Sequence, residues 1–182
     1  MAKLISKTYG EALFELAVEE NKTDIFMEEI LAVRAAIKQN PDLSALMNHP
    51  KIVKEEKIQV MENIFKGRVS EELVGFLKLI ISKDRYGEID EILEYFLDKI
   101  KEFKGIGVAY VTTPLPLDEI KKSIVEDKLL ETTSYNSMEM HFDVDETLIG
   151  GMVIRIGDRV VDSTIKTKLA ELEKQLLKIQ LA

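Results

Sequence analysis

Apolar residues recur at every third or fourth position through the first 105 residues of the chain, with short polar breaks between the runs. This spacing predicts amphipathic helices. Five helices are expected at about residues 3–20, 23–37, 41–47, 58–67 and from 70 onward. The sixth has the cleanest repeat and would bury Ile89, Ile92, Leu93, Phe96, Ile100 and Phe103. Because the connections are short, we expect a compact six-helix bundle.

Beyond Gly105 the pattern changes to that of short strands. We interpret Gly105 and Gly107 as a hinge that leads into a strand at 108–113. Asp118 is a candidate N-cap for a helix that ends near residue 131. Apolar and polar residues alternate at 138–144, which predicts an antiparallel strand with one wet face. The pair at 157–158, Gly-Asp, predicts a two-residue type II′ turn of a hairpin.

A terminal helix follows the hairpin. Asp162 and Ser163 offer N-cap oxygens, and one face of the helix carries Ile165, Leu169, Leu172, Leu176 and Ile179. The predicted fold is mostly α with a small α+β part. We expect a helical bundle over residues 1–105 and a domain over 106–182 that contains a small sheet or hairpin and the terminal helix.

The hairpin region also admits an enzymatic interpretation. Asp143 and Asp145 fit the D-x-D-x-T nucleophile loop of haloacid-dehalogenase-type phosphatases, and the acidic positions at 158 and 162 imitate their metal-binding motif. In those enzymes the nucleophile follows a buried parallel strand, which reads as a continuous apolar run. An alternating strand does not fit, and only about a dozen residues separate the two motifs. We therefore favour a structural sheet and keep the phosphatase as the alternative.

The same residues resemble a family signature. Leu148-Ile-Gly-Gly-x-Val-Ile-Arg-x-Gly-Asp-x-Val-x-Asp162, followed by a leucine-rich terminal helix, is similar to the C-terminal signature of the delta subunit of bacterial F-type ATP synthases. The mitochondrial relative is the oligomycin-sensitivity-conferring protein. Residues 9–17 resemble the first helix of the family and residues 76–85 the fifth. Ser163-Thr164 departs from the glycine and serine that the family usually has there.

The resemblance implies a non-catalytic stator subunit without a cofactor. In the family, a groove between the first and fifth helices receives the amphipathic N-terminal helix of an alpha subunit, and the C-terminal part contacts the peripheral-stalk b subunits. Such a subunit ties the catalytic head to membrane-anchored b subunits, so that rotor torque is resisted and ion flow stays coupled to ATP synthesis or hydrolysis. The expected location is the cytoplasmic face of the bacterial plasma membrane, as a peripheral part of the complex.

Two strips of small residues lie on the helices that the resemblance singles out. Such strips let another helix approach closely, although the two helices could equally pack tightly on each other or lie at the centre of the bundle. With the resemblance, the candidate contacts for the alpha-subunit helix are Tyr9, Gly10, Leu13, Ala17, Gly75, Lys78, Leu79 and Ser82. The candidates for the b subunits are Leu169, Leu172 and Leu176, which could equally form core that covers the hairpin.

Composition narrows the classes of function and partner that remain possible. A net charge of −8, shared by both halves, disfavours a nucleic-acid partner because phosphate contacts need clustered Lys and Arg. The absence of cysteine excludes disulfides and thiolate chemistry. His49 and His141 lie far apart in sequence, so we expect structural roles for both. No apolar run reaches the roughly 18 residues of a membrane span, and we expect no direct insertion. A helix-binding adaptor of another complex is the second alternative.

Overall fold

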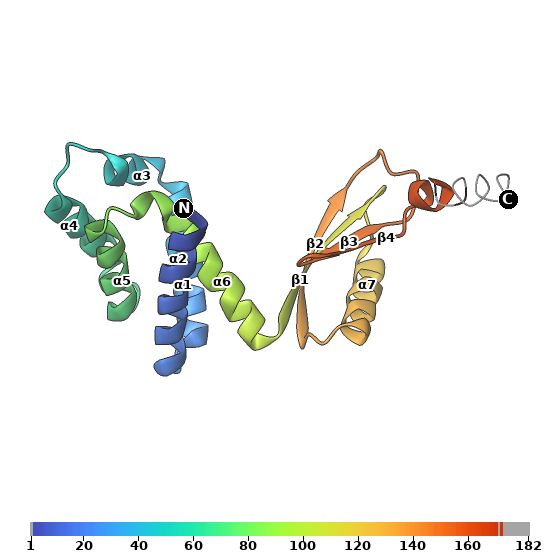
Figure 1. Ribbon diagram of the computed structural model, residues 1–182, viewed down its shortest axis with the longest axis horizontal. Helices are drawn as coiled ribbons and strands as arrows, with labels where there is room; N and C mark the ends of the chain where they lie inside the picture. Colours follow the sequence, from blue (N-terminus) through green and yellow to red (C-terminus); the bar gives the residue numbers. More distant parts are fainter. Residues whose placement is uncertain (1, 171, 173–182) are drawn as a thin grey trace. The chain divides into compact units, whose positions relative to one another are not determined.

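The computed structural model describes residues 2–170 and 172, and it confirms the expected fold class (Figure 1). A set of helices is followed by a small sheet with one helix between its strands. The chain divides into two compact units, Met1–Ile100 and Lys101–Ala182. The domain boundary that the sequence suggests at residue 105 stays a prediction.

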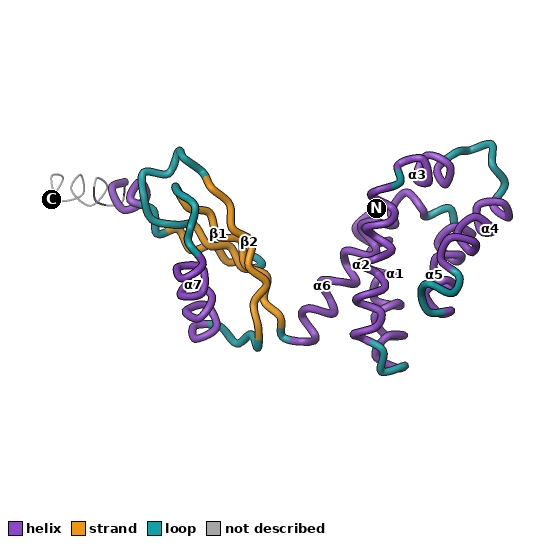
Figure 2. Tube along the Cα trace, turned by 180° about the vertical axis from the view of Figure 1, so that it is seen from behind, coloured by secondary structure: helices purple, strands orange, loops and turns teal. Residues whose placement is uncertain are grey.

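The first unit contains the expected helices in the expected order, with loops at the predicted breaks (Figure 2). They are α1 (Ala2–Glu19), α2 (Thr23–Gln39), α3 (Pro41–Asn48), α4 (Lys54–Phe65), α5 (Glu71–Ser82), the short 3-10 turn η1 (Tyr86–Glu88) and α6 (Ile89–Lys104). Proline at the first position of α3 costs no hydrogen bond because that N–H has no partner inside the helix.

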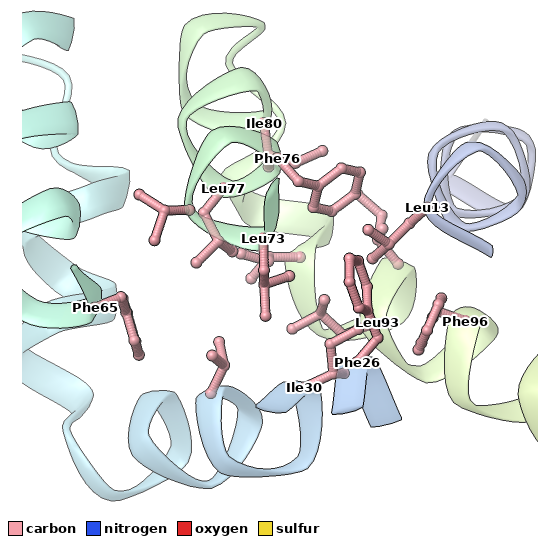
Figure 3. Close-up of a cluster of buried hydrophobic side chains, with 14 of the residues drawn as sticks. Leu13, Phe26, Ile30, Phe65, Leu73, Phe76, Leu77, Ile80, Leu93 and Phe96 are labelled. Carbon is pink, nitrogen blue, oxygen red and sulfur yellow. The ribbon is translucent and has the colours of Figure 1, made fainter. Parts of the chain in front are cut away.

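One apolar core holds the helices together. Figure 3 shows large side chains from α1, α2, α5 and α6 gathered around a common centre, and Phe26, Ile30 and Phe96 are fully buried there. The prediction for α6 holds with one correction. Phe103 is 60% exposed, whereas Leu97, which was not predicted, is buried. The last turn of α6 lies beyond Ile100 and so has left the bundle core.

Polar contacts fix how α2 sits against its neighbours. Arg34 of α2 donates to both carboxylate oxygens of Asp90 at the start of α6 and pairs with Glu94, 3.1 Å away. The Arg34 guanidinium lowers the pKa of the Asp90 carboxyl. At the other end, Glu29 of α2 accepts hydrogen bonds from the N–H and the hydroxyl of Ser70, at 2.8 and 2.6 Å, and this ties α2 to the start of α5.

The second unit is built on a four-stranded sheet. Its elements are β1 (Ile106–Thr113), α7 (Glu119–Thr132), β2 (Ser137–Val144), β3 (Val153–Ile156) and β4 (Arg159–Asp162), with the strand order β2-β1-β3-β4. Asp118 caps α7 as predicted, because its carboxylate accepts a hydrogen bond from the N–H of Lys121 at 2.8 Å. The hairpin of β3 and β4 is also as predicted, with Ile156 paired to Arg159 across a two-residue turn.

The prediction that residues 138–144 form an antiparallel strand is wrong in its direction. β2 pairs with β1 in parallel, from Ile106 opposite Ser137 to Thr113 opposite Val144. Two parallel strands need a crossover connection, and α7 supplies it. The alternation itself is present in part, since Met138 is buried and His141 is exposed, but Val144 at the end of the strand is 49% exposed. A strand at the edge of a small sheet has one wet face whichever way it runs, so alternation does not reveal its direction.

The junction between α6 and β1 is packed rather than free. Gly105 has a positive φ of 69°, and a Cβ added there would lie 2.7 Å from the Asn136 amide nitrogen. Asn136 also donates its backbone N–H to the Gly105 carbonyl at 2.7 Å. A Cβ at Gly107 would lie 2.5 Å from the Met138 sulfur. Both glycines therefore serve close packing against the start of β2, and the hinge interpretation stays a prediction.

The cap of the terminal helix is formed by a different residue from those predicted. Thr164 is buried, and its hydroxyl accepts a hydrogen bond from the N–H of Thr167 at 3.2 Å. Asp162 accepts hydrogen bonds from the Thr164 N–H and the Thr167 hydroxyl, and these hold its pKa below the usual range. Ser163 instead donates to the Met152 carbonyl at 2.9 Å. Residues 165–170 continue as helix.

Gly105→Ala should destabilise the protein more than Gly67→Ala. Both positions have positive φ, which costs a residue with a Cβ about 1–2 kcal/mol. At Gly67 no atom lies within 4 Å of the added Cβ, whereas at Gly105 Asn136 obstructs it. Urea unfolding followed by circular dichroism measures the difference. Equal losses in the two variants would show that the junction does not depend on this packing.

Acid should weaken the bundle partly through Asp90. Its pKa is lowered in the folded protein, so its contribution to stability is present above the ordinary aspartate pKa and is lost as the pH falls through the lower folded value. Asp90→Asn should therefore reduce stability at pH 7 and make the remaining stability less dependent on pH below about 4. Urea midpoints between pH 2.5 and 7 test this, with exposed Glu28→Gln on α2 as the control.

Candidate helix-binding groove

A hollow of about 530 Å³ lies between α1 and α5 on the surface of the first unit. The two helices run in opposite directions along it, because Lys22, just after α1, pairs with Glu72 at the start of α5 with 2.6 Å between Nζ and Oε1. We call this hollow the α1/α5 groove. It is lined by Thr8, Tyr9, Ala12, Leu13, Glu15, Leu16, Glu19, Glu72, Gly75, Phe76 and Leu79.

The floor of the α1/α5 groove is continuous with the apolar core. Leu13 is 1% exposed and Phe76 is 8% exposed, and Figure 3 shows both side chains in the space between α1 and α5. Leu79 lies on the wall and is 44% exposed, a large value for a leucine that lines a hollow. Covering these residues with another apolar surface would be favourable by about 25 cal/mol for each Å² of apolar surface removed from water.

Gly75 gives the groove its depth. It lies in the interior of α5, and a Cβ added there would have no atom within 4 Å. Glycine inside a helix costs about 0.5–1 kcal/mol relative to alanine. The packing of the unit itself therefore gives no reason for a glycine at this position. The missing side chain leaves open space in the groove.

The strip of small residues on α1 has a different role. A Cβ at Gly10 would lie 2.5 Å from a ring carbon of Tyr95 and 3.2 Å from the Ile92 carbonyl oxygen, so Gly10 lets α6 approach α1 closely. Ala17 is fully buried in the core. Neither residue lines the groove, while Tyr9 and Leu13 from the same prediction do. The internal-packing alternative thus describes part of the strip on α1.

The other two candidates on α5 lie beside the groove. Lys78 lines a second hollow of about 380 Å³ next to α4, and Gly75 borders both hollows. Lys78 pairs with Glu62 of α4, with 2.7 Å between Nζ and Oε2, and this lowers the pKa of the Glu62 carboxyl. Ser82 is exposed and donates to the Leu79 carbonyl at 2.8 Å. The structure therefore brings together four of the eight predicted residues: Tyr9, Leu13, Gly75 and Leu79.

Sequence reasoning missed much of the lining from α1. Thr8, Ala12, Glu15 and Glu19 follow one another at spacings of four, three and four residues, which places them along one side of the helix. That spacing was available as a signal. Two of these four residues are carboxylates, however, and neither fits a strip of small and apolar side chains.

The candidate leucines of the terminal helix are partly described. Leu169 is 55% exposed and Leu172 is 54% exposed, while Leu176 lies outside the described residues. Ile165, at the start of the helix, lies next to the Gly150 backbone, since a Cβ at Gly150 would be 2.7 Å from it. In the described part of the helix the two leucines are thus exposed, and Ile165 packs against the loop that precedes β3.

The residues singled out for chemistry have local structural contacts. The Asp145 carboxylate accepts hydrogen bonds from the hydroxyl and the N–H of Thr147, at 2.7 and 2.9 Å, which lower its pKa. His141 stacks on Tyr110 with 4.9 Å between ring centroids. The His49 ring accepts a hydrogen bond from the Lys51 N–H. Among the described residues no group of three or more His, Cys, Asp or Glu side chains is arranged to hold a metal ion.

Comparison with known proteins identifies the family. Residues 5–176 match the family described as ATP synthase delta (OSCP) subunit. The chain belongs to this family. It is 56% identical to ATP synthase subunit delta of Lachnoclostridium phytofermentans, with all of both chains covered, and 36% identical to that of Alkaliphilus oremlandii, with 98% and 99% covered. The delta-subunit resemblance is thereby confirmed.

The fold also matches a chain from a solved assembly. A chain in the mitochondrial ATP synthase hexamer of Toxoplasma gondii aligns with a TM-score of 0.72 and 16% identity, over 94% of this chain and 97% of that one. As a delta/OSCP subunit the protein is a component of the ATP synthase peripheral stalk and is not itself catalytic. The phosphatase alternative is accordingly set aside.

Gly75→Ala and Gly10→Ala should change stability in opposite directions. The first adds a Cβ into open space and removes the cost of a helical glycine, so the protein should gain about 0.5–1 kcal/mol. The second forces Tyr95 and the backbone of α6 to move, and should cost about 1–3 kcal/mol. Urea denaturation measures both. A destabilised Gly75→Ala variant would contradict the open space at this position.

Proposed function

We propose that this delta subunit ties the catalytic head of the ATP synthase to the peripheral stalk, with the α1/α5 groove holding the N-terminal helix of an alpha subunit. The observation that carries the proposal is Gly75, a helix-interior glycine without an internal packing partner beside an apolar hollow. An amphipathic helix laid in a groove needs this shape, because small residues allow close approach and apolar walls supply contact area.

The dimensions of the groove suit a short helix. Its lining on α1 extends from Thr8 to Glu19, about three helical turns or roughly 17 Å. Its apolar part comes from both helices, with Tyr9, Leu13 and Leu16 on one side and Phe76 and Leu79 on the other. A partner with an apolar stripe of three turns would cover Leu79 and leave its polar face in water.

For the other end of the tether we propose the b subunits of the stalk, with Leu169, Leu172 and Leu176 as contacts. The exposure of Leu169 and Leu172 supports this assignment. Exposed leucines at helical spacing form a stripe that a second helix can cover. The start of the terminal helix is held beside the sheet because Ser163 donates its N–H and hydroxyl to the Met152 carbonyl and Ile165 donates its N–H to the Gly150 carbonyl, so a load on the exposed leucines would pass into the sheet.

The mechanical task fits this kind of surface. During rotary catalysis the rotor exerts torque on the head, and a stator that slipped would uncouple ion flow from ATP synthesis or hydrolysis. A tether therefore needs a slow dissociation rate, and differences in affinity among related complexes lie mainly in that rate. Tight apolar packing supplies it without any reactive group.

We propose a peripheral position at the cytoplasmic face of the bacterial plasma membrane, reached through the other subunits. The described helices include none that is both long enough and apolar enough to cross a bilayer. Attachment through membrane-anchored b subunits would hold the protein at that face.

Titration with a synthetic peptide of the alpha-subunit N-terminal segment tests the groove. Gly75→Trp fills the hollow and Leu79→Asp places a charge on its wall, so each should weaken binding at least ten-fold. Leu31→Asp is the matched control, because Leu31 on α2 is 47% exposed and lies outside the groove lining. Fluorescence anisotropy measures affinity, and circular dichroism checks that every variant is folded.

The outcomes separate the alternatives. Unchanged binding by Gly75→Trp and Leu79→Asp would show that the peptide binds elsewhere. If the intact chain bound unrelated amphipathic peptides as well as the alpha peptide, the adaptor alternative would be favoured. If it bound no alpha peptide at all, the assignment of this partner would be wrong.

A further inference from the structure

The two ends of the α1/α5 groove differ in charge. Glu15, Glu19 and Glu72 line the end where α1 finishes and α5 begins, while Thr8, Tyr9 and Leu79 line the opposite end. The lining contains three carboxylates and no Lys, Arg or His. Charge is therefore concentrated at one end of an otherwise apolar hollow.

Two of these carboxylates are available to a partner. Glu72 is engaged by Lys22, and this contact lowers its pKa. Within the described part of the chain, Glu15 and Glu19 form neither an ion pair nor a side-chain hydrogen bond. Glu15 and Glu19 are both exposed on the groove wall, so a positive side chain of a partner can reach either carboxylate. A carboxylate in that position favours a positive group beside it.

The helix axes add to this asymmetry. The C-terminal end of α1 carries a partial negative charge from the aligned peptide dipoles of the helix, and it lies at the same end of the groove as Glu15 and Glu19. The opposing N-terminal end of α5 already has Glu71 and Glu72 in its first turn. The acidic end therefore favours the positive N-terminal end of a bound helix over its negative C-terminal end.

We infer that the groove reads both the direction and the charge pattern of the alpha-subunit helix, an inference that rests on the function proposed above. The bound helix lies with its N-terminal end at Glu15 and Glu19 and its C-terminal end near Thr8 and Leu79, and so runs parallel to α5. The partner that the groove fits is an amphipathic helix. Lys or Arg flanks its apolar stripe at the end that meets these carboxylates. Charge then selects the orientation, while apolar contact supplies most of the affinity.

The direction can be measured because the chain contains neither Cys nor Trp. Glu20→Cys places a fluorophore beside the acidic end, and Lys83→Cys places it beside the other end; both residues are exposed and lie outside the groove lining. The probes are two versions of the alpha N-terminal peptide, with Trp at the first or the last position as a contact quencher. The N-terminal Trp should quench the label at residue 20, and the C-terminal Trp the label at residue 83.

The charge pattern needs a second measurement. Glu15→Gln and Glu19→Gln should each weaken peptide binding about two- to five-fold, as expected for an exposed ion pair, and the loss should shrink at 0.5 M salt. Glu28→Gln makes the same change in net charge on the exposed face of α2 and should leave affinity unchanged. Reading the association rate separately should show that much of the loss lies in the on-rate.

Each outcome has a distinct meaning. If the quenching pattern were reversed while Gly75→Trp still weakened peptide binding, the inferred direction of the bound helix would be wrong and the groove assignment would stand. If Glu15→Gln and Glu19→Gln weakened peptide binding no more than Glu28→Gln does, the inferred recognition of charge would be wrong. Failure of the intact chain to bind either peptide would overturn the proposed function and this inference together.

Discussion

Helix α5 carries more apolar surface than one side of a helix can bury, and the first unit is organised around that excess. Six of its twelve residues, Leu73, Val74, Phe76, Leu77, Ile80 and Ile81, are buried. A helix that is apolar on most sides must be covered on more than one of them. Among the apolar residues and the glycine of α5, its neighbours cover all but Gly75 and Leu79. The α1/α5 groove is thus the uncovered edge of the core, and this explains why Leu13 and Phe76 belong to both.

Periodicity and chain breakers predicted most of the fold because the forces behind them are local. The helices of the first unit begin and end near Pro41, Pro50 and Gly67, where the backbone can no longer continue a helix. The direction of β2 could not be predicted in this way. Alternating residues report one buried and one wet face, whereas strand direction follows from the path of α7 between β1 and β2.

Only part of the groove lining could be predicted from the sequence, for a related reason. Gly10 and Gly75 look alike in the sequence, since each is a small residue in an apolar helix. In the structure a Cβ added at Gly10 would meet Tyr95, whereas a Cβ added at Gly75 would have no atom within 4 Å. Only the neighbours of a position decide whether a missing side chain serves the core or a partner. The acidic end escaped prediction because Glu15 and Glu19 gain meaning only when α5 lies opposite them.

The path of force between the two proposed attachment points is the last consequence of this architecture. The groove belongs to the first unit and the exposed leucines to the second, so a load between them passes along α6 into β1. Five apolar side chains besides Ile100 anchor α6 in the core, and Lys101 in its last turn pairs with Glu139 of β2, with 2.7 Å between Nζ and Oε2. Gly105 then packs on Asn136. Each end of this connection is thus anchored within its own unit, α6 by buried apolar side chains in the first and β1 by an ion pair and a strand ladder in the second.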